Sequence, residues 1–149
     1  MHRILVLHGP NLDALGTREP EIYGTDSLDT LHQRLQQLGR ELDCEVDCFQ
    51  SAHEGLLIDA LHRARDRSDG VVLNPGGLTH TSVALRDAVR AAGVPVVEVH
   101  VSNPSAREPF RHASLISGAA LAVVQGFGPA SYELALRGLA GFLARETKR

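Results

Sequence analysis

Short runs of β-branched and apolar residues alternate with amphipathic helical windows from one end of the chain to the other. This alternation predicts a parallel sheet with helices on both faces, because consecutive parallel strands are joined by crossovers that are usually helical. The expected strands cover residues 3–7, 45–50, 70–74, 96–101 and 121–125. The sequence therefore predicts a single α/β domain over residues 1–149, a doubly wound five-stranded parallel sheet in three αβα layers.

Helices are expected where leucine and alanine recur at spacings of three and four residues. The clearest helix starts near residue 28, behind a predicted capping pair of Asp26 and Asp29. Its apolar stripe consists of Leu28, Leu31, Leu35, Leu38 and Leu42. Shorter stripes predict helices around 57–64, 85–92 and 136–143. The stretch 103–117 has prolines and little periodicity, so it is expected to be a loop with a short helical turn.

Composition and charge favour a small solute as the partner. A net charge of -3 provides no polybasic field for nucleic acid or for a membrane surface. No segment approaches the roughly 20 apolar residues of a membrane span. Cys44 and Cys48 fall in one predicted strand, about 13 Å apart and too far for a disulfide, so reduced thiols are expected. Reduced thiols favour a cytoplasmic location.

Polar residues follow the predicted strands, at the edge where open parallel sheets bind their ligands. They are residues 8–11, 51–54 and 74–77 after the first three strands, and Glu98, His100 and Ser102 at the fourth. The sequence lacks the glycine fingerprint of a dinucleotide site, a phosphate loop and the paired acidic residues of a phosphoryl relay. No pair of its eight histidines has tight ligand spacing. These three common uses of the fold therefore fit poorly, and no metal site is predicted.

The fourth predicted strand places a carboxylate and an imidazole on one face. Its valines point one way, whereas Glu98, His100 and Ser102 point the other. An unpaired carboxylate inside this apolar run is costly, so Glu98 is expected to be hydrogen-bonded. One hypothesis is that Glu98 orients His100 as a general acid or base. A purely structural contact at a sheet edge is an equal alternative.

Glycines at positions 16 and 24 bracket a short polar segment, in a pattern typical of a hinged lid over residues 17–24. Its Tyr23 needs a neighbouring cation to serve as a base, since the pKa of a phenol is ordinarily about 10. Arg18 is the predicted neighbour. A surface loop with a half-packed tyrosine is the alternative.

Two further groups are candidates for ligand binding. Arg107 and Arg111 lie in the irregular stretch after the fourth strand, where either guanidinium can clamp a carboxylate. A solvated charge run is the alternative. The third helix is expected to begin at residues 79–82, and the free backbone N–H groups of a helix N-terminus favour an anion or polar ligand. Simple capping by Thr79 or Thr81 explains this stretch equally well.

These motifs together resemble the type II 3-dehydroquinate dehydratases, over residues 4 to about 139. The shared motifs are Gly9-Pro10-Asn11-Leu12, Leu15-Gly16-Thr17-Arg18-Glu19-Pro20, Tyr23-Gly24, Gln50-Ser51, His53-Glu54-Gly55, Asn74-Pro75-Gly76, Thr79 through Asp87, Glu98-Val99-His100, Ser102-Asn103 and Ala106-Arg107-Glu108. This family converts 3-dehydroquinate to 3-dehydroshikimate by removing water, through an enolate and without a cofactor. The resemblance implies a hydro-lyase with a flavodoxin-like fold, assembled as a dodecamer of four trimers.

The resemblance also implies a role for each candidate residue. Tyr23 is expected to be the base beside the ketone, with Arg18 lowering its pKa and helping to close the lid. Asn11 is expected to hold the water that stabilises the enolate. His100, oriented by Glu98, is expected to protonate the departing hydroxyl. The substrate-binding positions are matched by Asn74, His80, Val101, Ser102, Arg107 and Arg111, and a position that the family contributes to a neighbouring subunit's site is matched by Asp87.

Several residues depart from the family pattern. His8 and Asp13 stand for usual asparagines, Ala52 stands for an amide, and Pro104-Ser105 stands where a bulkier pair is common. His8, near Asn11 at the end of the first strand, is in a position to alter the hydrogen bonding of the site.

Two other functions compete with the dehydratase. One is a non-catalytic flavodoxin-like module that binds a small carboxylate or a nucleotide. The other is a hydrolase that uses Ser82 or Ser102, although the sequence has no nucleophile elbow. Neither explains Arg18 together with Tyr23. The sequence does not separate aromatic biosynthesis from quinate breakdown.

Overall fold

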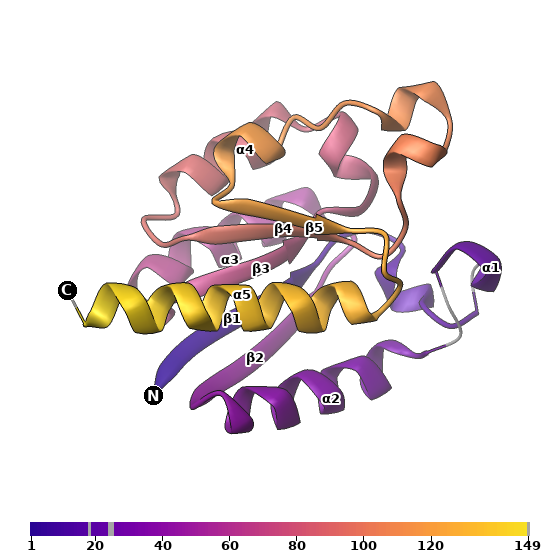
Figure 1. Cartoon of the computed structure of the whole chain (residues 1–149). Helices are drawn as coiled ribbons and strands as arrows, with labels where there is room; N and C mark the ends of the chain where they lie inside the picture. The colour runs from indigo at the N-terminus through magenta and orange to yellow at the C-terminus, as the bar shows by residue number, and fades with distance from the viewer. Residues whose placement is uncertain (18, 24–25, 149) are drawn as a thin grey trace.

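The computed structural model of the protein describes residues 1–17, 19–23 and 26–148. Its elements follow the predicted alternation, and each predicted strand is found to within one residue at either end (Figure 1). The strands are β1 (His2–His8), β2 (Cys44–Gln50), β3 (Gly70–Asn74), β4 (Val96–His100) and β5 (Ala122–Gln125). The helices are α1 (Pro20–Tyr23), α2 (Leu28–Glu41), α3 (Glu54–Arg67), α4 (Val83–Ala91) and α5 (Ala130–Thr147). Short 3₁₀ turns cover Leu12–Ala14, Gly76–His80, Pro104–Ala106, Pro109–Arg111 and Ser117–Ala119.

The strands form one parallel sheet in the order β2-β1-β3-β4-β5. This order is that of flavodoxin-like folds, which confirms the predicted fold class. The register aligns His8 with Gln50 and Asn74, and His100 with Gln125. The residues that end these strands therefore meet at one edge of the sheet. α1 lies at this edge, whereas Met1 and the end of α5 lie at the opposite one (Figure 1).

Two apolar layers hold the helices to the sheet. The layer under α2 and α5 includes Val6, Leu35 and Leu136, and the layer under α3 and α4 includes Leu61 and Leu85. Burying one such side chain contributes about 1.5–3 kcal/mol. The two layers thus position the strand ends rigidly.

The N-cap of α2 differs from the prediction. The cap is Ser27, whose Oγ accepts a hydrogen bond from the N–H of Thr30 at 3.1 Å. Asp26 pairs instead with Arg34, and Asp29 lies in the first turn. The predicted pair of aspartates was therefore wrong, because the cap position falls between them.

The start of α4 also differs from the prediction. Thr79 belongs to a separate 3₁₀ turn, and the N-cap of α4 is Ser82, whose Oγ accepts from the N–H of Leu85 at 2.9 Å. The expectation that Thr79 or Thr81 caps this helix was wrong. α5 begins at Ala130, earlier than its apolar stripe predicted, and thereby includes Tyr132.

Two further expectations concern the chain as a whole. Cys44 and Cys48 are free thiols on β2, which confirms that they do not pair. Among the helices of the described residues, none combines the length and the apolar character that crossing a bilayer requires.

Candidate active site

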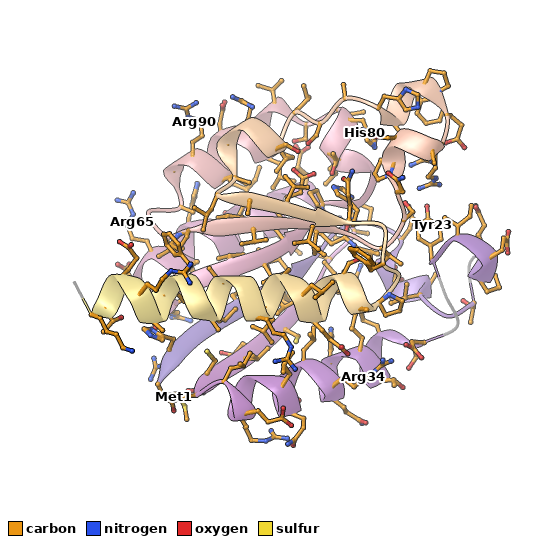
Figure 2. All side chains as sticks on the ribbon, in the orientation of Figure 1. Met1, Tyr23, Arg34, Arg65, His80 and Arg90 are labelled. Carbon is orange, nitrogen blue, oxygen red and sulfur yellow. The ribbon has the colours of Figure 1, made fainter. Side chains whose placement is uncertain are left out.

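A pocket lies at the carboxyl ends of β1, β3 and β4, beside α1. It is lined by Pro10, Asn11, Leu12, Tyr23, Asn74, Gly76, Gly77, His80, His100, Val101, Ser102, Pro104, Arg107 and Arg111. Nine of the twelve predicted site residues are thus brought together. Figure 2 shows Tyr23 and His80 at this end of the molecule, far from Met1, Arg65 and Arg90.

Three predicted residues do not line this pocket. Glu98 lies on β4 and contacts His100. Asp87 is exposed on α4, away from the residues that line this pocket. Arg18 lies outside the described residues, as does Gly24 at the end of the predicted lid.

Glu98 and His100 form a buried pair on one face of β4, as predicted. The Nε2 atom of His100 is 2.5 Å from Oε2 of Glu98, which is 1% exposed. An ionised carboxylate only accepts hydrogen bonds, so Nε2 of His100 carries the proton that Glu98 accepts. The other ring nitrogen, Nδ1, is then the atom that can exchange a proton with a ligand. β4 lies between β3 and β5, so the pair is not on an edge strand, and the structural and the catalytic interpretation of the contact both stay predictions.

Two serines complete the surroundings of this carboxylate. Oγ of Ser117 and Oγ of Ser114 donate to Oε1 of Glu98 at 2.8 and 3.1 Å. Burial alone raises the pKa of Glu98, but the hydrogen bonds from His100 and the serines, with the charge of His100, hold it below its ordinary value. Glu98 therefore stays ionised. Sequence reasoning missed both serines, because no periodicity or motif marks them.

Arg107 lies over the ring of Tyr23, the last residue of α1. Its Cζ atom is 5.2 Å from the ring centroid, within the range of a cation–π contact. Its Nη1 atom donates to Oγ of Ser102 at 3.2 Å. Tyr23 is 9% exposed and packs against the layer under α2 and α5, so the alternative of a half-packed surface tyrosine is wrong. These contacts tie α1 to the segment after β4.

A chain of buried hydrogen bonds fixes Asn74. The N–H of Gly76 donates to its Oδ1 at 3.0 Å, and its Nδ2 donates to Oη of Tyr132 at 2.9 Å. The same Oη shares a hydrogen bond of 2.9 Å with Nδ1 of His8. The unusual His8 therefore reaches the pocket through Tyr132. Sequence reasoning missed Tyr132, although its spacing of four before Leu136 continues the stripe of α5.

Comparison with known proteins decides the family. A family model described as "Dehydroquinase class II" matches residues 2–140. The chain belongs to the class II dehydroquinase family. It is 54% identical over 147 residues to "3-dehydroquinate dehydratase" of Gloeobacter violaceus, an alignment that covers 99% of this chain and 92% of the relative. It is also 51% identical over 137 residues to "Catabolic 3-dehydroquinase 2" of Aspergillus flavus, covering 92% and 91%.

A solved structure agrees with this membership. The type II dehydroquinase from Propionibacterium acnes superposes with a TM-score of 0.92 at 44% identity, covering 95% of this chain and 97% of that one. The predicted resemblance and the prediction of a hydro-lyase of this family are thereby confirmed.

The remaining polar groups of this class II dehydroquinase pocket are also oriented. Nδ1 of His80 donates to the carbonyl oxygen of Ala113 at 2.8 Å, so its proton position is fixed. Nε of Arg111 donates to Oε2 of Glu108 at 2.6 Å. Asn11 has a left-handed backbone (φ 71°), which asparagine tolerates better than most residues. Of the described residues that line the pocket, two are arginines and none is a carboxylate, which favours an anionic ligand.

Proposed function

We propose that this chain eliminates water from 3-dehydroquinate to give 3-dehydroshikimate, through an enolate and without a cofactor. One observation carries the proposal: a phenol on α1 and an imidazole held by a buried carboxylate line the same pocket. An elimination needs a group that removes a proton and a group that protonates the leaving hydroxyl. The names of the relatives from Gloeobacter violaceus and Aspergillus flavus support the same reaction.

In the proposed reaction, the phenolate of Tyr23 takes the proton beside the ketone, and the electron pair of that C–H bond forms the enolate. Asn11 holds a water that donates a hydrogen bond to the enolate oxygen. The enolate then re-forms the ketone as the C–O bond to the hydroxyl breaks, and His100 supplies the proton that makes the leaving group water. A proton passes back from Tyr23 to His100 through solvent. General acid and base steps each contribute about 10²- to 10⁴-fold.

Glu98 acts in this proposal as a positioning residue. It holds the Nε2–H of His100, so that Nδ1 is the atom that transfers the proton. The substrate carboxylate is expected to bind a guanidinium, because a planar fork of N–H donors matches a carboxylate. The side chains that we assign to substrate binding are Asn74, His80, Ser102, Arg107 and Arg111, together with the backbone at Val101.

We extend the proposal to the lid. Residues 17–24 are proposed to close over the substrate as part of a single catalytic domain. Arg18 is expected beside Tyr23, although it lies outside the described residues. The cation–π contact of Arg107 supports a positively charged surrounding for this tyrosine.

The family's dodecamer of four trimers is proposed for this chain as well, with Asp87 entering a neighbour's site. Exposed apolar side chains support association, because subunit contacts commonly cover such groups. They include Leu121, Val123 and Phe127 at and beyond the edge strand β5. Sedimentation velocity measures the assembly, and a monomer would remove Asp87 from the proposal.

A cytoplasmic location stays a prediction.

The reaction is tested with purified, metal-stripped protein and 3-dehydroquinate, by following the ultraviolet absorbance of the conjugated enone product. Turnover in the presence of a chelator is expected. Stoichiometric binding without turnover would instead favour the non-catalytic carboxylate-binding module, and His8→Asn would be the first reversion to make.

The base is tested with Tyr23→Phe, which should abolish turnover while substrate binding and the fold are retained. Near-normal turnover would remove the tyrosine from the mechanism.

The acid is tested with His100→Ala, which should block departure of the hydroxyl while exchange of the substrate proton with solvent continues. Little change would mean that another acid acts. His62→Ala is the matched control, because His62 is exposed on α3 and does not line the pocket.

A further inference from the structure

A second group of reactive side chains lies away from the pocket lining, and the proposed dehydration does not use it. His8 on β1, His32 on α2 and Cys48 on β2 present one donor atom each, and these atoms all lie within 4.8 Å of one another. All three side chains gather between α2 and its face of the sheet. We propose that His8, His32 and Cys48 bind a divalent transition-metal cation such as Zn²⁺, through two imidazoles and one thiolate.

The distances are close to those that such a cation requires. Nε2 of His8 and Nε2 of His32 are 2.9 Å apart, with the ring centroids 4.9 Å apart. Bonds of about 2.0–2.1 Å to nitrogen and about 2.3 Å to sulfur place tetrahedral ligand atoms roughly 3.3–3.6 Å apart. The nitrogens must therefore separate slightly, and the sulfur must approach by at most about 1.2 Å. His32 is half-buried on the helix surface, where its side chain has room to adjust.

Two imidazole nitrogens and one thiolate sulfur are donor atoms that divalent transition metals prefer. Imidazole and thiolate are the usual ligands of zinc. In the metal-free protein, burial and Asp47 raise the pKa of Cys48 to about 12, so a cation must displace the thiol proton to solvent, as coordination does. Asp29 acts electrostatically on His32, as Asp47 does on Cys48. Both negative charges would favour the positive charge that a bound cation brings.

An outer hydrogen bond also supports His8 as a ligand. Its Nδ1 atom, 2.9 Å from Oη of Tyr132, can keep the ring proton while Nε2 turns its lone pair to the metal. Metal-bound histidines almost always have such a partner on the second nitrogen. Three protein ligands leave a fourth position for water or a small ligand. The expectation of no metal site relied on local spacing, whereas these ligands come from three separate elements.

Cobalt(II) is the probe for this site, because a cobalt–thiolate bond has a charge-transfer band in the near ultraviolet. Metal-stripped protein titrated with Co²⁺ should develop this band and saturate at one equivalent, and Zn²⁺ should abolish it by competition. Cys48→Ser should lose the band. Cys44→Ser, the matched control on the same strand, should keep it, because that thiol is not part of the cluster and donates to the carbonyl of Leu42.

The histidines are tested by affinity. Outer-shell changes typically weaken metal binding about 10- to 100-fold, so loss of a direct ligand in His32→Gln should raise the Kd for Co²⁺ by more than about 100-fold. His62→Gln should leave the Kd unchanged. No charge-transfer band in the unsubstituted protein, or a band that survives Cys48→Ser, would overturn the proposal, as would unchanged affinity in His32→Gln. The assay needs no substrate, so its outcome is independent of the proposed dehydration.

Discussion

Tyr132→Phe removes a single oxygen atom from a fully buried side chain (0% exposed). That oxygen is the partner of Nδ2 of Asn74 and of Nδ1 of His8, both at 2.9 Å. Asn74 and His8 are 3% and 0% exposed, so neither can recover its hydrogen bond from bulk water. An unsatisfied buried polar group costs about 1–3 kcal/mol, so two of them should lower the free energy of unfolding by about 2–6 kcal/mol.

Urea unfolding of metal-stripped protein at matched concentration measures this loss, as a lower midpoint at an unchanged slope. The double variant Tyr132→Phe with His8→Leu removes one of the orphaned groups. It should therefore be less destabilised than the sum of the single variants, by about 0.5–3 kcal/mol. A loss below about 1 kcal/mol together with strict additivity would refute the reasoning.

The same substitution should also affect the proposed reaction. Without the hydroxyl of Tyr132, the side-chain amide of Asn74 loses the partner of Nδ2 and keeps the hydrogen bond that Oδ1 accepts from the N–H of Gly76. We expect KM for 3-dehydroquinate to rise about tenfold, equivalent to about 1.4 kcal/mol, with a smaller change in kcat. A fall in kcat at constant KM would contradict the assignment of Asn74 to substrate binding.

Two further predictions concern stability. The pKa of Glu98 is lowered from its ordinary 4.5, so its carboxylate adds stability above about pH 4.5 that is lost as the pH falls through the folded value. Glu98→Gln should therefore be less stable at neutral pH but lose less stability in acid, as measured by urea unfolding across an acid pH series; parallel curves would contradict this. Gly9→Ala places a Cβ 2.5 Å from the carbonyl oxygen of Pro75, a backbone atom that cannot move aside cheaply. It should cost about 1–3 kcal/mol, whereas Gly138→Ala, which meets open space on α5, should not destabilise; equal midpoints would exclude the predicted clash.

The fold was predictable because each strand and helix has its own local pattern. The stripe of leucines from Leu31 to Leu38 is buried, and the alternation along β4 puts Glu98 and His100 on one face. A cap depends on a single hydrogen bond rather than on a repeated pattern. Ser27 was therefore missed beside two equally plausible aspartates.

The candidate site was predictable where short motifs carried it. Nine predicted residues line one pocket, but their partners come from distant parts of the chain. Ser117 reaches Glu98 across 19 residues, and Tyr132 reaches Asn74 across 58. No local rule of propensity or spacing encodes a contact between such distant positions. For the same reason the cluster of His8, His32 and Cys48 could not be predicted from the sequence.

The hydrogen bonds of Glu98 also anchor the stretch that carries Ser114 and Ser117. Ser114 and Ser117 belong to a stretch of little regular structure, yet both donate to a buried negative charge. The amides of Ile116 and Ser117 in turn donate to Oγ of Ser114. Local opening of this stretch would leave the carboxylate without those donors, so it should open about as rarely as the sheet itself. Slow amide hydrogen exchange would then extend beyond β4, and a segment that has the composition of a loop would behave as part of the rigid frame.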